Sequence, residues 1–284
     1  MDNERQRALI ALSLWISLGV FIAFYYINIL LILFLSLIIF NTLLRVRRWL
    51  RFLFEGLTSF VLAFLFIQGF YLLHTKYIQF GICLSSLCLY YITEYLFVCT
   101  FHYNTLSWNS FLINQSKYFI ACLLFSFSEF FLEFFLFGDY KILKVFIVIG
   151  SIGLIIGQSI RITTLFTAGK NFHHNIQHEF SPDHRLLTTG LYSFTRHPSY
   201  LGWYIWAMSS QVLMVNPVSF YVYWIACRLF LNVRVNYEEE TLIKLFRNDY
   251  LEYMKKVPTR IPYVPGINLN EYEKSKYKAN RFDL

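Results

Sequence analysis

The chain has 284 residues, of which 57% are hydrophobic and 15% are charged, and its formal net charge is +8. A soluble domain of average composition is about 45–50% apolar and about 25% charged. The composition therefore argues against an ordinary soluble protein and favours a membrane protein, whose basic balance indicates cytosolic loops beside anionic lipid rather than nucleic acid. The five cysteines all lie in apolar stretches without metal-ligand spacing, which predicts buried, reduced thiols.

The first 160 residues predict six transmembrane helices. Residues 8–44 carry no acidic or basic side chain and are too long for one span of about 20 residues, so we expect two spans with a turn near Tyr26–Asn28. Four arginines between Arg45 and Arg51 then mark a cytosolic loop. Four more apolar segments predict the remaining spans, at residues 57–73, 78–98, 118–137 and 142–160.

The fifth expected span contains two acidic residues, Glu129 and Glu133, four positions apart. This spacing places both on one face of a helix. Carboxylates at membrane depth are candidates for function. The alternative is that they lie near the lumenal interface or face other helices, and the sequence leaves both interpretations open.

The last third of the chain is more polar, and we expect residues 161–266 to form a cytosolic cofactor-binding module and residues 267–284 a polar tail. An apolar stretch at residues 200–231, broken by Asn216-Pro217, predicts a transmembrane helical hairpin within this module. A charged stretch at residues 233–256 predicts a further helix. The expected fold is an all-α, polytopic membrane protein with about eight transmembrane helices and a cytosolic cofactor pocket.

Five of the seven histidines lie between residues 161 and 197. His173 and His174 are adjacent, so their side chains point apart, and no HExxH motif or paired cysteines support them. We therefore expect no metal site.

The segment from Gly190 to Trp203 is the most distinctive part of the sequence, because Tyr, Arg, His and Gly crowd where a polar loop meets a span. Pro198 is suited to open a helix at its first turn. Gly202 permits close approach of a ligand or another helix. The unpaired N–H groups of such a helix start suit an anionic ligand group, although a positively flanked membrane entry is the simpler alternative.

A second feature is the pair Arg234 and Glu238, which are four residues apart and so share a helix face. The pair is either an ordinary surface contact or a charged pair at the membrane boundary above a pocket.

Residues 161–262 resemble the isoprenylcysteine carboxyl methyltransferases. The matching stretches are Phe166–Phe172 with His174, Gly190–Gly202, Arg234 with Glu238-Glu239, and Tyr250 and Tyr253 with Val257-Pro258 and Ile261-Pro262. The sequence departs from the family at Arg247, where a glycine often follows a phenylalanine, and we expect this difference to affect a helix bend.

The resemblance implies transfer of a methyl group from S-adenosylmethionine to the C-terminal carboxylate of a prenylated cysteine. The implied substrates are prenylated CaaX proteins such as small GTPases and lamins, at the endoplasmic reticulum membrane, with the active site facing the cytosol. Membrane lipid is an expected partner and nucleic acid is not.

The resemblance also implies roles for individual residues. The implied catalytic residues are Arg234, Glu238 and Arg161, and the implied substrate contacts are Arg234 and His174. The implied cofactor contacts are Gln177, His184, Arg185, Leu186, Leu187, Tyr192, His197, Pro198, Ser199, Tyr200 and Glu238.

Elementary chemistry agrees with this reaction. A carboxylate is ionised at pH 7 and is already a nucleophile, so no general base is required. The planar fork of an arginine suits the task of holding it. The alternatives are an NADPH-dependent sterol reductase or a phospholipid N-methyltransferase on the same scaffold, or a non-catalytic receptor or transporter. An N-methyltransferase acts on an amine, for which Arg234 is a poor contact.

Overall fold

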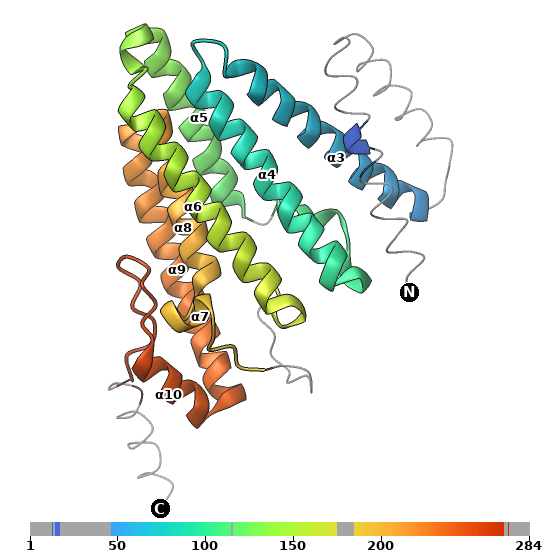
Figure 1. The fold of residues 1–284 in the computed structure, drawn as a ribbon, viewed down its shortest axis with the longest axis vertical. Coiled ribbons are helices and arrows are strands. Elements are labelled where there is room, and N and C mark those ends of the chain that lie inside the picture. The colour runs from blue at the N-terminus through green and yellow to red at the C-terminus, as the bar shows by residue number, and fades with distance from the viewer. Residues whose placement is uncertain are drawn as a thin grey trace, which may run out of the picture. The chain divides into compact units, whose positions relative to one another are not determined.

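The computed structural model describes residues 13, 15–17, 47–114, 116–174, 185–269 and 272, and it confirms the all-α class. Within this part of the chain the only β-type pairing is an isolated bridge between Ile261 and Val264. Figure 1 shows the α-helices, which are α3 (Arg47–Leu72), α4 (Ile78–Phe101), α5 (Lys117–Phe137), α6 (Lys144–Ala168), α7 (Leu191–Phe194), α8 (Pro198–Met214), α9 (Pro217–Phe246) and α10 (Asn248–Lys256). Short 3₁₀ turns join them at η1 (Tyr103–Thr105), η2 (Trp108–Phe111), η3 (Gly138–Lys141) and η4 (Gly169–Asn171).

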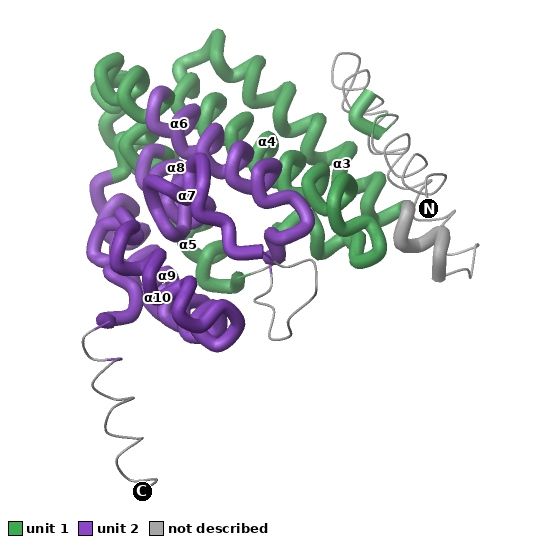
Figure 2. Tube along the Cα trace, turned by 60° about the horizontal axis from the view of Figure 1, so that its bottom comes forward, with its two compact units in different colours: residues 1–151, 210–216 green, residues 152–209, 217–284 purple. Residues whose placement is uncertain are grey.

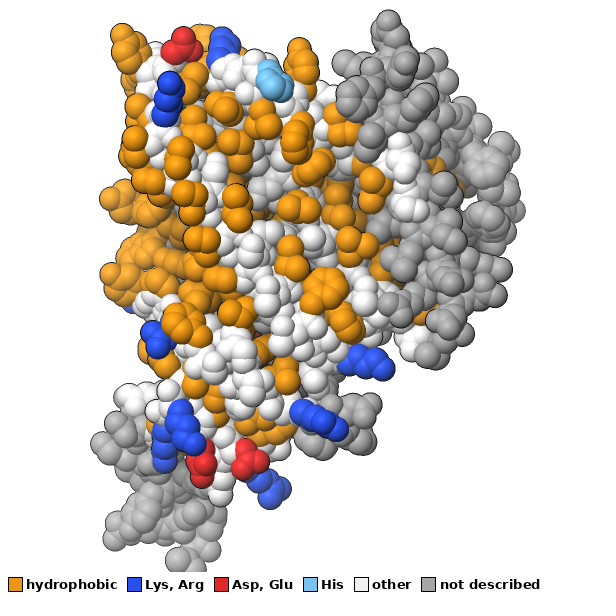
Figure 3. Space-filling view, viewed as in Figure 1, with side chains coloured by type: hydrophobic (Ala, Val, Ile, Leu, Met, Phe, Trp, Pro, Cys, Tyr) orange, Lys and Arg blue, Asp and Glu red, His pale blue; other side chains and the backbone are white. Residues whose placement is uncertain are grey.

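Five segments of the described chain are long and apolar enough to cross a membrane: Leu53–Leu72, Ile78–Phe101, Lys117–Lys141, Lys144–Asn171 and Pro217–Phe246. The first four match the spans expected at residues 57–73, 78–98, 118–137 and 142–160, although the first ends at Leu72 and the fourth begins at Lys144. Large apolar side chains on them are exposed, as lipid-facing residues would be, and Figure 3 shows that charged side chains lie mainly toward helix ends. The two spans expected within residues 8–44 fall almost wholly outside the described residues, so the count of eight stays a prediction.

The chain divides into two compact units (Figure 2). Unit 1 comprises Met1–Ser151 and Ser210–Asn216, and unit 2 comprises Ile152–Ser209 and Pro217–Leu284. In unit 1, α3 and α4 pack closely where Gly69 meets Gly81, because a Cβ on Gly69 would lie 2.7 Å from the Gly81 carbonyl oxygen. Small residues at such crossings let membrane helices approach backbone to backbone.

A buried polar network in unit 1 holds the turn between α8 and α9. The Lys141 ammonium forms an ion pair with Glu133 and donates to the Val215 carbonyl at 3.1 Å and to Asn216 Oδ1 at 3.0 Å. The Asn216 amide in turn donates to the Ser126 carbonyl at 2.8 Å. This pairing supports the interpretation in which Glu133 faces other parts of the protein.

In unit 2, two glycines, Gly157 on α6 and Gly202 on α8, let these helices pack closely together. A Cβ on Gly202 would lie 2.8 Å from the Arg161 backbone nitrogen and 2.8 Å from the Gly157 carbonyl oxygen. Any larger residue at position 202 would therefore separate the helices. The close approach expected of Gly202 is confirmed, and it places Arg161 next to the start of α8.

The expected separate helix at residues 233–256 is wrong, because α9 runs without interruption from Pro217 to Phe246. No glycine or proline occurs between Val218 and Phe246, so nothing local ends the helix where the sequence turns from apolar to charged. The break comes at Arg247, whose φ of +49° lies in the left-handed region that favours glycine. Glycine would adopt this angle without strain; here an arginine does so, and the chain bends before α10 begins at Asn248.

Candidate active site

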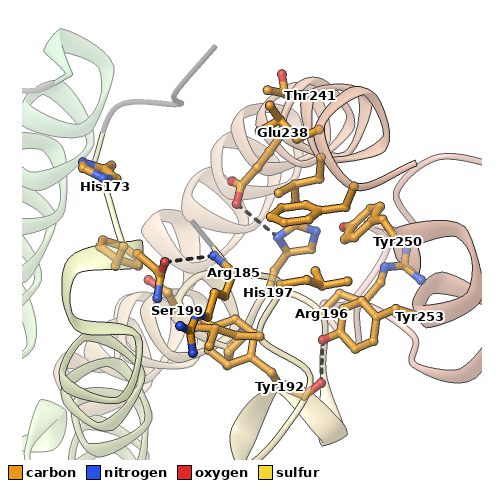
Figure 4. A pocket seen from close by; sticks show the side chains of 18 of the residues that line it. His173, Arg185, Tyr192, Arg196, His197, Ser199, Glu238, Thr241, Tyr250 and Tyr253 are labelled. Atoms are coloured by element: carbon orange, nitrogen blue, oxygen red, sulfur yellow. Dashed lines mark hydrogen bonds and ion pairs between the residues drawn. The ribbon is translucent and has the colours of Figure 1, made fainter. Parts of the chain in front are cut away.

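Unit 2 contains a cavity with about 990 Å³ of space not filled by protein atoms, part of it open to solvent. Figure 4 shows side chains around it from the segment after η4, from α7 and the residues before it, and from helices α8, α9 and α10. Its lining consists of Asn171, Phe172, His173, Arg185, Leu186, Leu187, Tyr192, Arg196, His197, Pro198, Ser199, Tyr200, Glu238, Thr241, Leu242, Leu245, Phe246, Tyr250 and Tyr253.

The local sequence explains how the chain enters this wall. Gly190 has a φ of +61°, which turns the chain into the single helical turn of α7. Thr195 is extended, and α8 then begins at Pro198, as the sequence predicted. The N–H groups at the start of a helix have no partners within it, so Ser199 and Tyr200 present an anion-binding helix end at the cavity.

Behind this helix start lies a buried ionic network centred on Glu239. Arg196 Nε donates to Glu239 Oε1 at 2.8 Å, and His197 Nε2 lies 3.0 Å from the same oxygen. The backbone N–H of Ile267 donates to Glu239 Oε2 at 2.7 Å. Arg196 also donates to the Val257 carbonyl at 2.8 Å, so the loop after α10 is joined to the cavity wall. A buried ion pair is tolerated where hydrogen bonds satisfy both partners in this way.

A second chain of polar contacts runs along the exposed side of the same wall. Arg234 Nε donates to the Tyr200 hydroxyl at 2.9 Å, and that hydroxyl donates to Glu238 Oε2 at 2.5 Å. Arg234 also donates to the His174 carbonyl oxygen. The predicted proximity of Arg234 and Glu238 is therefore mediated by Tyr200. Within the described part of the chain the two side chains form no direct ion pair.

Arg161 and His174 lie behind the cavity rather than in its lining. Arg161 donates to the side chain of Ser199 and, at 3.4 Å, to its carbonyl oxygen, and its guanidinium carbon lies 5.7 Å from the Phe172 ring centroid. The His174 imidazole packs edge-on against the same ring at 5.4 Å. Both residues thus contact side chains that line the cavity.

The other sequence-based candidates divide clearly. Arg185, Leu186, Leu187, Tyr192, His197, Pro198, Ser199, Tyr200 and Glu238 line the cavity. Arg234 lies one contact away from it through Tyr200. Gln177 and His184 fall outside the described residues. Among the described residues no group of three or more His, Cys, Asp or Glu side chains is arranged to hold a metal ion.

Sequence reasoning assigned no role to Arg196 or to the cavity wall formed by the end of α9 and by α10. Tyr250 is the most informative of these residues, because it is 1% exposed and its hydroxyl has no hydrogen-bond partner within the described chain. Tyr253, by contrast, donates to the Tyr192 carbonyl at 2.5 Å. The sequence signal for this wall was that Tyr250 and Tyr253 belong to the stretches that resemble the family.

These phenols stay protonated at neutral pH. Burial raises the pKa of Tyr253 to about 12 and raises the pKa of Tyr250 well above its ordinary value. Burial, reinforced by the negative charge of Glu238, also raises the pKa of Tyr192. Tyr250 therefore contributes a neutral, buried hydroxyl to the cavity wall.

Comparison with known proteins places these residues in a family context. Residues 148–244 match the isoprenylcysteine carboxyl methyltransferase (ICMT) family. The protein-S-isoprenylcysteine O-methyltransferase of Dictyostelium discoideum is 41% identical over 183 residues, which cover 64% of this chain and 77% of that protein. The enzyme of the same name from Homo sapiens is 37% identical over 192 residues, 68% of each chain.

The fold is also similar to a solved structure. The eukaryotic intramembrane Ras methyltransferase ICMT superposes with a TM-score of 0.77 at 27% sequence identity, covering 93% of this chain and 98% of that one. The similarity therefore extends beyond the part of the sequence that carries the motifs.

Proposed function

This chain belongs to the isoprenylcysteine carboxyl methyltransferase family and is a membrane methyltransferase, and on that premise we propose how its cavity acts. The methyl donor is S-adenosylmethionine, and the acceptor is the C-terminal carboxylate of a prenylated cysteine in CaaX-processed proteins such as small GTPases and lamins. Residues 161–266 form the module that binds the donor. The observation that carries this proposal is the cavity in which Glu238, the start of α8 and the unpaired Tyr250 hydroxyl meet.

The residues present fit S-adenosylmethionine. Its carboxylate suits the first-turn N–H groups of Ser199 and Tyr200, and its ammonium suits the carboxylate of Glu238. Its adenosine part suits the wall formed by Leu242, Phe246 and Tyr250. The buried Tyr250 hydroxyl has no hydrogen-bond acceptor within the described chain, and the adenosine could supply one. When bound, the donor supplies an electrophilic methyl group on a sulfonium.

The implied cofactor contacts extend this assignment. Arg185, Leu186, Leu187, Tyr192, His197 and Pro198 line the same cavity and complete the proposed donor site. Gln177 and His184 are retained as proposed contacts from the family resemblance alone.

Arg234 is proposed to hold the substrate carboxylate. An arginine has five N–H donors. Two contacts, to the Tyr200 hydroxyl and to the His174 carbonyl, orient the Arg234 guanidinium. Among the described residues nothing else accepts from Arg234, so its remaining donors can hold one carboxylate oxygen while the other attacks. No proton has to be removed, because the acid is ionised at pH 7. His174 and Arg161 act by supporting Arg234 and Ser199, respectively.

The membrane supplies the substrate. A prenyl chain gains about 0.8 kcal/mol per buried CH₂ in lipid, so the substrate enters from the bilayer with its carboxylate at the interface. We place the enzyme in the endoplasmic reticulum membrane with the cavity facing the cytosol, which agrees with the basic loop at Arg45–Arg51. Methylation removes a negative charge and strengthens attachment of the product to an anionic leaflet.

The direct test supplies membranes containing the folded protein with labelled S-adenosylmethionine and a farnesylated cysteine analogue that has a free carboxylate. We expect a base-labile methyl ester. A preparation that binds the donor but forms no ester with this acceptor would contradict the proposed substrate. Methylation of a phospholipid amine instead would favour the alternative N-methyltransferase, for which the cationic Arg234 offers no complementary contact.

A further inference from the structure

The apolar first half of α9, which we expect to face lipid, contains a single positively charged residue, Arg228. Between Pro217 and Val233 the helix has no acidic residue and no other basic one. Its neighbours Tyr221, Ile225 and Leu229 are 65%, 51% and 65% exposed, as expected of side chains that face lipid. Across the described chain no oxygen accepts a hydrogen bond from Arg228 and no carboxylate pairs with it. With respect to the described residues, all five of its N–H donors are therefore available.

Two aromatic rings position this guanidinium. Its carbon lies 6.0 Å from the Trp224 ring centroid and 5.7 Å from the Tyr263 ring centroid. The two rings meet edge to face, 5.5 Å apart at 89°. We call Trp224, Arg228 and Tyr263 the aromatic corner. The indole N–H and the phenol hydroxyl add two donors beside the guanidinium, and neither has an acceptor within the described chain.

The backbone at Tyr263 is held in an unfavourable conformation to complete this corner. Tyr263 has a φ of +60° and is 65% exposed, in a turn that the Val264 N–H closes onto the Ile261 carbonyl at 3.1 Å. Glycine or asparagine is the usual residue at such an angle. The turn is anchored from within, because the Thr259 hydroxyl donates to the Val264 carbonyl at 2.5 Å. Strain retained at an exposed aromatic residue points to a function of that residue.

The turn also locates the membrane surface on this side of α9. Irregular backbone does not face lipid within the hydrocarbon region, so the turn at Tyr263 lies outside that region. Because Tyr263 contacts Trp224 on the exposed apolar part of α9, we place the turn at the headgroup level. Trp and Tyr side chains concentrate at that level. A membrane arginine without a protein acceptor there meets lipid phosphates, which its planar fork binds in a bidentate manner.

We propose that the aromatic corner binds the phosphate of an anionic phospholipid. Charge favours an anionic over a zwitterionic lipid, since no acidic residue occurs at positions 217–233 or 253–270. Lys255, Lys256 and Arg260, which precede the turn in sequence, add positive charge to it.

The test titrates the purified full-length protein in detergent with phosphatidylglycerol or phosphatidylcholine and counts bound lipids by native mass spectrometry. We expect at least one tightly bound phosphatidylglycerol, about tenfold weaker binding of it in Arg228→Gln, and an intermediate affinity in Arg228→Lys, which keeps the charge but loses the fork. The matched control is Lys144→Gln, which removes an exposed positive charge at the start of α6 in unit 1 and should leave this affinity unchanged.

Tyr263→Gly separates binding from folding. Glycine adopts the positive φ without strain, so the variant should unfold at the same or a higher temperature than the wild type while its phosphatidylglycerol affinity falls about threefold or more. Equal binding in Arg228→Gln, or an equal loss in Lys144→Gln, would overturn the proposal. Displacement of the lipid by glycerol phosphate would assign a free-phosphate site instead, and displacement by farnesyl-cysteine would assign a substrate site. Either result overturns the proposal.

Discussion

Both compact units bury ionic and polar side chains, and in unit 2 such a group borders a cavity. In unit 1, Lys141 bonds to both Glu133 and Asn216, and these contacts hold a turn. In unit 2, Arg196 and His197 bond to Glu239 on one side and line a cavity on the other. A buried charge in a membrane protein is therefore not by itself evidence of catalysis. Buried ionic groups that also border a cavity are the better candidates for a functional site.

The same criterion, whether a group borders a cavity, applies to buried polar atoms that lack a hydrogen-bond partner. Gln79 Oε1 in unit 1 and the Tyr250 hydroxyl in unit 2 both lack hydrogen-bond partners within the described chain. The Gln79 amide group is nevertheless fixed by its nitrogen, which donates to the Lys141 and Leu213 carbonyls at 3.2 Å and 3.1 Å. Tyr250 lines the cavity, so a bound molecule can supply its acceptor.

The largest expected effect is a loss of stability when the buried carboxylate of the unit 2 network, Glu239, is neutralised. Glu239→Gln leaves Arg196 buried without its counter-charge, and removing one partner of a buried ion pair costs about 3–5 kcal/mol. Unfolding by denaturant or heat in detergent measures this loss. The neighbouring Glu238→Gln is the matched control, because Glu238 is partly exposed, and it should retain nearly all stability. Equal losses in the two variants would remove the distinction between the structural and the open carboxylate.

The next largest effect is a loss of turnover when Arg234, on the exposed side of the cavity wall, is truncated. Arg234→Ala should lower turnover of a farnesyl-cysteine substrate by roughly 30-fold to several thousand-fold, equivalent to about 2–5 kcal/mol for truncating a hydrogen-bonded charge partner. Affinity for S-adenosylhomocysteine, measured by calorimetry, should survive. Arg234→Lys should recover only part of the activity, because lysine lacks the planar fork. Loss of cofactor affinity with unchanged substrate affinity would show that the assigned role is wrong.

Disrupting unit 1 tests the other half of the comparison. Lys141→Met removes the partner of Glu133 and a donor to Val215 and Asn216, which should cost about 1–3 kcal/mol of stability. Cofactor affinity of the folded fraction should not change. Lys144→Met removes an exposed lysine of the same unit and should alter stability by less than about 0.5 kcal/mol. A selective loss of cofactor binding in Lys141→Met would mean that this network does more than hold the turn.

The smallest effect is the most specific. Tyr250→Phe should weaken S-adenosylhomocysteine binding by about 2- to 12-fold, the equivalent of one hydrogen bond worth about 0.5–1.5 kcal/mol. Its stability should not fall, because the lost hydroxyl had no partner within the described chain. Tyr253→Phe provides the contrast, since it breaks the bond to the Tyr192 carbonyl and should lower stability instead. Unchanged affinity in Tyr250→Phe would mean that no cofactor atom accepts from this hydroxyl.

Much of the site could be predicted from the sequence because its signals are local. Pro198 begins α8, Pro217 begins α9, and the apolar segments at residues 57–73, 78–98, 118–137 and 142–160 fall almost wholly within helices, each for reasons confined to a few neighbouring residues. The family-like motif also indicated most of the side chains that line the cavity on α8 and before α7.

Other features depended on neighbours distant in the sequence. The sequence by itself determined that this protein is a membrane helical protein with its chemistry in the last third, because hydropathy, prolines and motif spacing act locally. Among the consecutive acids Glu238, Glu239 and Glu240, only tertiary structure decided that Glu239 turns inward to Arg196 while Glu238 lines the cavity. Successive helical residues point about 100° apart, and which direction becomes the interior depends on what packs there. The same dependence on packing decided that α10 folds back at Arg247 to close the cavity with Tyr250.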